Sequence, residues 1–186
     1  MLYAGCHLSN SAGNLAMVET AVSIGANTFA FFTRNPRGSQ AKKEDPVDSA
    51  KAVEALKEHN FGPLVAHGAY TMNLCTAEES AREFAASVLC DDLRRMAYLP
   101  GNYYNFHPGS HVGQGTEAGI EYIVKALKKA LEPGYPVTVL LETMQARAVR
   151  SAENLKSSKP SSTAWEVLPS AYAWIAAMCT TAAMIL

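Results

Sequence analysis

Three residues of types that commonly bind transition metals stand at equivalent places along the chain. His67, His107 and Glu142 end the short apolar runs 63–67, 103–107 and 137–142. Imidazole nitrogens and a carboxylate form a ligand set suited to zinc and other first-row metals, and a carboxylate can bridge to a second ion. Each histidine alone could simply bond a backbone carbonyl at a strand end. Three such residues at equivalent positions favour a metal site.

Two further histidines are weaker candidates for this site. His7 also ends an apolar run, and it could reach a metal or orient a ligand through a hydrogen bond. His111 lies in a glycine-rich loop and could contact a phosphate or face water. The four cysteines form no Cys-x-x-Cys pair and no secretory signal opens the sequence, so we expect reduced thiols and a cytoplasmic protein.

Five apolar runs alternate with four amphipathic stretches, a pattern typical of repeated strand–helix units. The expected strands are 2–7, 28–32, 63–67, 103–107 and 137–142, and the expected helices are 14–24, 46–59, 77–98 and 117–131. Polar residues end four different strands, which is how a (β/α)8 barrel assembles a site at one mouth. A doubly wound open sheet would usually carry a glycine-rich phosphate-binding turn after its first strand. That turn is here Ser9-Asn10-Ser11-Ala12-Gly13, so the sequence favours a barrel.

Composition divides the chain in two. Overall, 48% apolar residues and a net charge of -1 exclude a disordered chain and a strongly basic nucleic-acid coat, so any contact with DNA requires local positive charge. All 12 glycines and all five histidines fall at or before Gly134. From Gln145 onward there is no Gly, His, Asp or Phe. We therefore expect two segments, 1–144 and 145–186, of different origin.

The first segment resembles the endonuclease IV family of zinc-dependent DNA repair enzymes, which cleave DNA at abasic sites and have a TIM-barrel fold. Five runs carry the resemblance, in order and at suitable spacing: Gly5-Cys6-His7-Leu8-Ser9, Phe32-Thr33-Arg34-Asn35-Pro36-Arg37, His67-Gly68-Ala69-Tyr70-Thr71-Met72-Asn73-Leu74, Asn105-Phe106-His107-Pro108-Gly109-Ser110-His111 and Leu141-Glu142-Thr143. They cover residues 1–144.

The resemblance implies roles for individual residues. His67, His107 and Glu142 match ligands of one zinc ion, with Glu142 bridging to a second ion and serving catalysis. Arg37 and Tyr70 match residues that enter the DNA stack at the lesion, and Asn35 in the same loop is expected to contact DNA. On residue type alone, Tyr70 would be a half-buried loop aromatic and Arg37 a solvated charge. Family members often carry an apolar wedge after the tyrosine, where this chain has Thr71.

The second segment departs from the family. The three zinc ions of an intact family site also need ligands from strands six to eight, which this sequence lacks, so we expect at most one complete site here. When the reading frame is shifted by two bases, the codons from Met144 to Ala148 can encode Ala-Gly-Lys-Gly. In the same shifted frame, the codons from Trp174 to Cys179 can encode Asp-Ser-Cys-His-Val, and both peptides are close to family motifs. We therefore interpret 145–186 as an out-of-frame, irregular or helical tail. The uncharged stretch 167–186 is also long enough for a membrane anchor, but its Pro, Ser and Thr residues and the absence of flanking basic residues disfavour one.

The sequence thus predicts a truncated TIM barrel of about five β/α units, because a (β/α)8 fold needs roughly 250 residues. The expected family activity is hydrolysis of the phosphodiester 5′ to an abasic site in double-stranded DNA, by a monomer that contacts no membrane. We expect this chain itself to be inactive or nearly so. The alternatives are a xylose isomerase-like sugar isomerase or epimerase, and a fragment without function.

Overall fold

A computed structural model describes residues 1–142 and 184–185 of the chain. The elements are, in order, β1 Ala4–Leu8, a 3-10 turn Asn10–Ala12, α1 Asn14–Ser23, β2 Thr28–Phe32, α2 Pro46–Glu58, β3 Val65–His67, α3 Glu79–Met96, β4 Asn102–Phe106, α4 Thr116–Leu131, β5 Val137–Leu141 and β6 Met184–Ile185. All five predicted strands and all four predicted helices are present, each within a few residues of the expected bounds.

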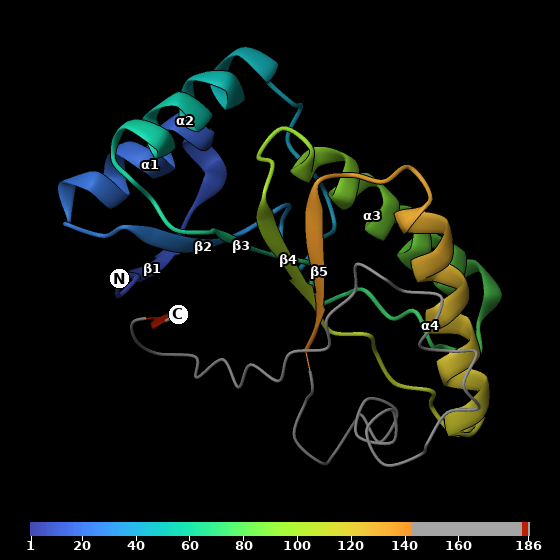
Figure 1. Cartoon of the computed structure of the whole chain (residues 1–186). Coiled ribbons are helices and arrows are strands. Elements are labelled where there is room, and N and C mark those ends of the chain that lie inside the picture. The colour runs from blue at the N-terminus through green and yellow to red at the C-terminus, as the bar shows by residue number, and fades with distance from the viewer. Residues whose placement is uncertain (143–183, 186) are drawn as a thin grey trace.

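The strands form one sheet in the order β5-β4-β3-β2-β1-β6. Neighbours among β1 to β5 pair in parallel, each with the next strand along the chain. This is the order of consecutive β/α units in a TIM barrel, with the helices packed as the pairs α1–α2 and α3–α4 (Figure 1). The expectation of about five β/α units of such a barrel is confirmed.

Helix starts follow from local capping and from one contact between helices. The Asp45 carboxylate accepts hydrogen bonds from the backbone N–H groups of Val47 and Asp48, and Pro46 opens α2 with the backbone angle that a helix needs. The Asp48 carboxylate in turn accepts the N–H of Asn14, 2.6 Å away, at the start of α1. The first N–H groups of α1 and of α2 are therefore each bound by an aspartate carboxylate, from Asp48 and Asp45 respectively.

The core lies between the sheet and the helices. β2 is buried along most of its length, as expected for an interior parallel strand, whereas β5 alternates buried and partly exposed residues. In β4 the residues Tyr104 and Phe106 are fully buried among the helix side chains. The intervening residues Asn105 and His107 point to the opposite face, because successive strand side chains alternate. That opposite face carries the candidate site.

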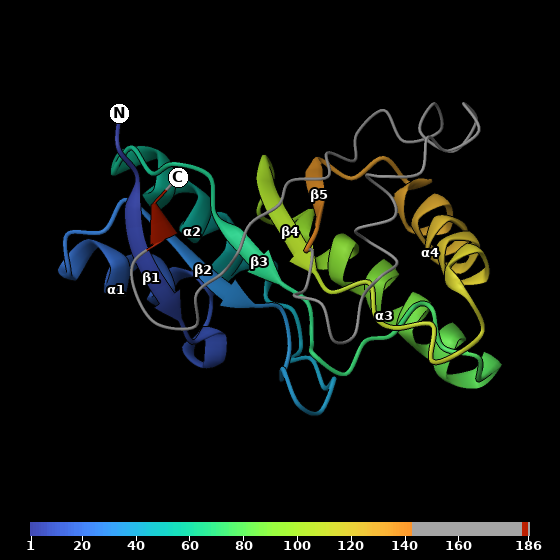
Figure 2. The ribbon, with the colours of Figure 1, turned by 90° about the horizontal axis from the view of Figure 1, so that it is seen from below.

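The carboxyl ends of β1 to β5 meet at one edge of the sheet, where the segments after β2 and β3 also leave it (Figure 2). His67 is the last residue of β3, and His107 and Glu142 each follow their strand by one residue. The Glu142 N–H donates to the Phe106 carbonyl at 3.0 Å, which extends the β4–β5 ladder to the site residue.

Little of the expected tail lies among the described residues. Met184 and Ile185 form a short strand antiparallel to β1, where Ala4 pairs with Ile185, in place of the helical or irregular backbone expected there. The outer edge of β1 offers unpaired backbone groups, and this pairing uses them. Across 1–142 and 184–185, every helix is too short or too polar to cross a bilayer, and the anchor considered at 167–186 falls mostly outside those ranges.

Candidate metal centre at the mouth of the partial barrel

Three neighbouring strands bring two imidazoles and one carboxylate together. One potential ligand atom from each of His67, His107 and Glu142 lies within 4.8 Å of the other two. Oε2 of Glu142 is 3.1 Å from Nε2 of His67 and 3.9 Å from Nε2 of His107. Two ligand atoms bound about 2.1 Å from one tetrahedral ion lie about 3.4 Å apart, so these spacings suit a shared ion.

The hydrogen bonds of His67 support this interpretation. Its Nδ1 lies 2.7 Å from the carbonyl oxygen of Gly68, and because a carbonyl only accepts, Nδ1 must carry a proton. In a neutral ring Nε2 then holds a lone pair, and it faces the carboxylate of Glu142. Two acceptors this close need a positive charge between them, either a proton on the ring or a metal ion. A histidine that donates through its other nitrogen is the usual arrangement of a metal ligand.

His107 also fits a metal ligand. Among the described residues, its Nδ1 is one of two buried side-chain nitrogen or oxygen atoms that have no hydrogen-bond partner. The other nitrogen, Nε2, faces Glu142 at 3.9 Å and is the one placed to bind an ion shared with that carboxylate. The donor set of two imidazoles and one carboxylate is of the type that catalytic zinc sites use.

The surroundings set the charge states that a metal requires. Burial lowers the pKa of His107 below its usual 6.5. The negative charge of Glu142 raises this pKa, and the nearby His67 lowers it further. For Glu142, burial would raise the pKa, but the surrounding side chains of His67, His107 and Asn105 lower it below 4.5. Both shifts favour the forms that bind metal at neutral pH, a neutral imidazole and an ionised carboxylate.

Asn105 is a site residue that the sequence interpretation missed. Its side chain is buried and its amide Nδ2 donates a hydrogen bond to Oε2 of Glu142. The signal was present in the sequence, because Asn105 precedes His107 by two residues at the end of a strand and therefore shares its face. A buried amide in that position needs a partner, and Glu142 is that partner.

The residues expected at the DNA lie at the rim of this mouth. Tyr70 is 56% exposed, and its ring is stacked on that of His107, with 5.7 Å between centroids. Arg37 is exposed in the loop between β2 and α2. Asn35 is also exposed, but its side-chain oxygen accepts the backbone N–H of Arg37 at 3.0 Å. Asn35 therefore shapes the loop that presents Arg37.

The two weaker histidine candidates lie outside the three-residue cluster. His7 packs against Phe32, with ring centroids 4.8 Å apart, and its pKa is lowered by burial and by the nearby charge of His67. His111 turns toward its own loop, where its Nδ1 accepts N–H groups from Gly113 and Gly115. Its present contacts thus organise the loop before α4.

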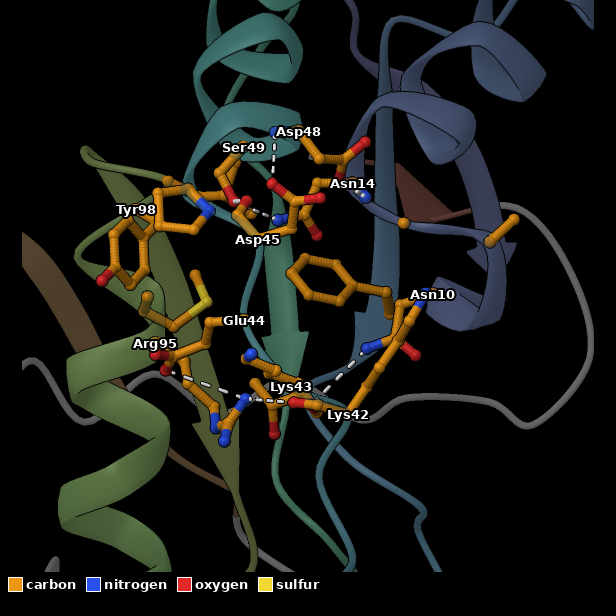
Figure 3. Close-up of a pocket in the computed structure, with 17 residues that line it drawn as sticks. Asn10, Asn14, Lys42, Lys43, Glu44, Asp45, Asp48, Ser49, Arg95 and Tyr98 are labelled. Carbon is orange, nitrogen blue, oxygen red and sulfur yellow. Dashed lines mark hydrogen bonds and ion pairs between the residues drawn. The ribbon is translucent and has the colours of Figure 1, made fainter.

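A separate cavity of about 640 Å³ opens on the helix side of the sheet (Figure 3). Its walls come from α1, the 42–49 segment and the end of α3, and it contains none of the predicted site residues. Asp45 and Asp48 on its wall are engaged as helix caps, and Arg95 donates to the Lys42 carbonyl. These three side chains, labelled in Figure 3, therefore hold helices and loops together.

The fold and the mouth define a TIM-barrel protein with a candidate metal site of two histidines and one glutamate. The chain belongs to the family of xylose isomerase-like TIM barrels, which matches residues 18–157. Within the matched range, the segments after β2, β3, β4 and β5 carry the candidate site.

Curated relatives of similar sequence indicate the particular family within this group of TIM barrels. A protein named probable endonuclease 4 from Alkaliphilus oremlandii is 53% identical over 159 residues, which are 86% of this chain and 57% of that protein. Another of that name from Akkermansia muciniphila is 54% identical over 147 residues, or 79% of this chain and 53% of that protein. The resemblance to endonuclease IV is confirmed, and the chain spans about half the length of the curated relatives it matches.

Comparison with solved structures agrees with the assignment to this family. The crystal structure of endonuclease IV from Thermus thermophilus matches with a TM-score of 0.63 and 32% identity, over 80% of this chain and 55% of that one. A D-psicose 3-epimerase crystallised with D-fructose matches with a TM-score of 0.61 over 91% of this chain and 62% of that one. Its identity of 10% shows a shared fold alone.

Proposed function

We propose that this chain is the amino-terminal part of a zinc-dependent endonuclease that hydrolyses the phosphodiester 5′ to an abasic site in double-stranded DNA. One observation carries the proposal. His67, His107 and Glu142 converge within 4.8 Å at the mouth of the partial barrel, directly beside the exposed ring of Tyr70. A metal-binding cluster and an aromatic surface thus meet at the place where a nucleotide would enter.

The chain's own residues prepare the metal site and hold its protons. Zinc, when bound, lowers the pKa of a bound water and stabilises the leaving oxygen. Glu142, the proposed catalytic carboxylate, is kept ionised by the donors around it, and Asn105 fixes its orientation. His67 keeps its proton on Nδ1 through the Gly68 carbonyl, which leaves Nε2 directed at the site.

The rim residues would recognise the lesion. An enzyme that takes a nucleotide out of the stack must replace the lost stacking, and an aromatic ring and a planar guanidinium can do so. Tyr70 and Arg37 are exposed and therefore able to contact DNA without rearrangement of the core. Thr71, in the place of an apolar wedge, is predicted to weaken insertion. The cytoplasmic location and the monomeric state also stay predictions.

Incision requires more than this site, in our proposal. Within the parts that the structure describes, one group of three potential metal ligands is present. We propose that residues 1–144 are part of the enzyme and that residues 145–186 are translated out of frame. The chain therefore binds one zinc ion and abasic DNA but incises the DNA poorly. The nucleotide sequence around codon 144 tests this interpretation of residues 145–186. If no shift of the reading frame there yields metal-binding residues downstream, the interpretation is wrong.

The functional test compares two duplexes of one sequence, one intact and one with a single tetrahydrofuran abasic analogue. We expect the full chain in zinc-containing buffer to bind the abasic duplex about tenfold more tightly than the intact one, since lesion recognition carries only part of the affinity. Equal affinity for both duplexes would refute the proposal. Rapid incision would refute the expected inactivity, and turnover of a ketose would instead support an isomerase or epimerase.

A matched pair of variants tests whether the three-residue cluster binds the zinc ion. His107→Ala should abolish zinc binding at this site, whereas His59→Ala removes a histidine that follows α2 and lies outside the cluster. We expect only the first variant to lose zinc. If His59→Ala lowers zinc stoichiometry equally, the assignment of the cluster is wrong.

A further inference from the structure

A buried ion pair joins the loop that carries Arg37 to helix α3. Arg34 is 7% exposed, and its Nε and Nη2 both donate to Oδ1 of Asp92, at 2.8 and 2.7 Å. Its Nη2 also reaches Asp91 at 2.7 Å, and its Nη1 donates to the carbonyl of Ser39 at 2.9 Å. Arg34 therefore binds both α3 and the far end of its own loop, with Arg37 lying between.

The same aspartate is joined to the loop that carries Tyr70. The hydroxyl of Tyr104 donates to Oδ2 of Asp92 at 2.6 Å, and both side chains are fully buried. That hydroxyl lies directly against Gly68, where an added Cβ would come within 2.6 Å of its oxygen. Tyr104 thus supports the backbone two residues before Tyr70.

The two loops also bond directly to each other. The N–H of Tyr70 donates to the carbonyl of Pro36 at 3.0 Å, and the hydroxyls of Ser39 and Thr71 are hydrogen-bonded. Arg37 lies between Pro36 and Ser39, so its flanking residues are tied to Tyr70 and to the residue after it. A displacement of either loop would break contacts in the other.

We propose that Arg34, Asp92 and Tyr104 are positioning residues that hold the Arg37 loop and the Tyr70 loop as one preformed surface for abasic DNA. The DNA part of this inference rests on the proposed function. Burying an ion pair costs desolvation that apolar side chains would avoid, so its value lies in a defined geometry. Loops held in their binding conformation lose less entropy when the ligand arrives.

The test uses two conservative substitutions, each compared with a control variant that makes the same chemical change at another residue. Tyr104→Phe removes the hydroxyl under Gly68, and Tyr103→Phe removes one from the adjacent residue, which has no side-chain hydrogen bond among the described residues. Asp92→Asn weakens the buried pair with Arg34, and its control Asp48→Asn weakens a carboxylate of α2 that accepts the N–H of Asn14 at 2.6 Å. The controls alter the same chemistry without touching either loop connection.

The first readout is hydrogen exchange of backbone amides in the full chain. In Tyr104→Phe and in Asp92→Asn we expect exchange at Tyr70 and at the amides of 35–40 to speed up by about tenfold more than exchange in β4 and β5. A merely structural role would speed exchange in the loops and in the sheet by the same factor. Faster exchange in one loop alone, or the same effect in the Tyr103→Phe control, would overturn the coupling.

The second readout is binding of the full chain, in zinc-containing buffer, to a duplex with 2-aminopurine beside the tetrahydrofuran site. We expect both variants to bind about tenfold more weakly and to produce a smaller fluorescence rise, with zinc affinity close to that of the unmodified chain. Both variants also lower the urea midpoint because each removes a buried partner, so binding is measured without denaturant, where the chain is folded. Unchanged DNA affinity together with loosened loops would refute the role at DNA. If the unmodified chain does not prefer the abasic duplex, the proposed function fails, and hydrogen exchange still decides the loop coupling.

Discussion

Removal of the Asn105 side chain should weaken the metal site without dismantling it. Asn105 donates a hydrogen bond to the carboxylate of Glu142, which is 8% exposed, so water has little access to replace the lost donor. A hydrogen bond to a charged group contributes roughly 1.5–3 kcal/mol. Loss of such a supporting contact lowers metal affinity by roughly 10–100-fold, or about 1.4–2.7 kcal/mol. We expect Asn105→Ala to lie in the upper part of that range because the carboxylate is buried.

The assay is competition for zinc between the full chain and a chromophoric chelator at neutral pH. Asn102→Ala is the matched control, because it removes a second buried asparagine from the same strand. Asn102 accepts the N–H of Leu64 at 2.7 Å and donates to the carbonyl of Leu99 at 2.9 Å, away from the metal site. Both variants should lower the free energy of unfolding by about 1–3 kcal/mol.

Only Asn105→Ala should lose zinc affinity. If it binds zinc within twofold of the unmodified chain, Asn105 does not support Glu142 and the reasoning fails. If Asn102→Ala loses as much zinc affinity as Asn105→Ala, general destabilisation explains both results and the specific contact has no measurable role.

Three further predictions test the charge, the acid stability and the core. Glu142→Gln keeps the shape of the site but removes its carboxylate charge, so zinc affinity should fall by about 100-fold in the same competition assay, and a change below fivefold would count against Glu142 as a ligand. Burial opposes ionisation of Asp91, but hydrogen bonds from three arginines, Arg95 foremost, lower its pKa to about 2. Its stabilising effect is therefore complete above pH 3.8 and is lost as the pH falls toward 2, so Asp91→Asn should lower the urea midpoint at pH 7 and make little difference at pH 2. Leu64 is 1% exposed, so Leu64→Ala should cost about 2–5 kcal/mol of unfolding free energy in urea titrations while the folded fraction still binds zinc normally.

Much of the fold could be predicted because its signals are local. A buried parallel strand needs a continuous apolar run, and β2 has one in Thr28–Phe32, which matches the predicted range. Aspartate followed by proline predicts a helix start, and α2 begins at Pro46. The ends of parallel strands share one edge, so the strand-end positions of His67, His107 and Glu142 already suggested that they meet.

The contacts around those residues depend on partners far away in the sequence. Arg34 looks like a solvated charge in a polar loop, yet it is buried because Asp92 on α3, 58 residues later, folds against it. His111 has the residue type of a ligand, but its nitrogen is taken up by Gly113 and Gly115 of its own loop. No local pattern distinguishes these outcomes from their opposites.

The sequence by itself determined the order of strands and helices and the polar residues at the ends of four of the five predicted strands, since apolar periodicity and capping act between near neighbours. The tertiary structure alone decided that Asn105 supports Glu142 and that Tyr104 connects Asp92 to Gly68. The reason is physical: strand register and helix packing set distances between side chains dozens of residues apart, and hydrogen bonds depend on differences of a few tenths of an ångström.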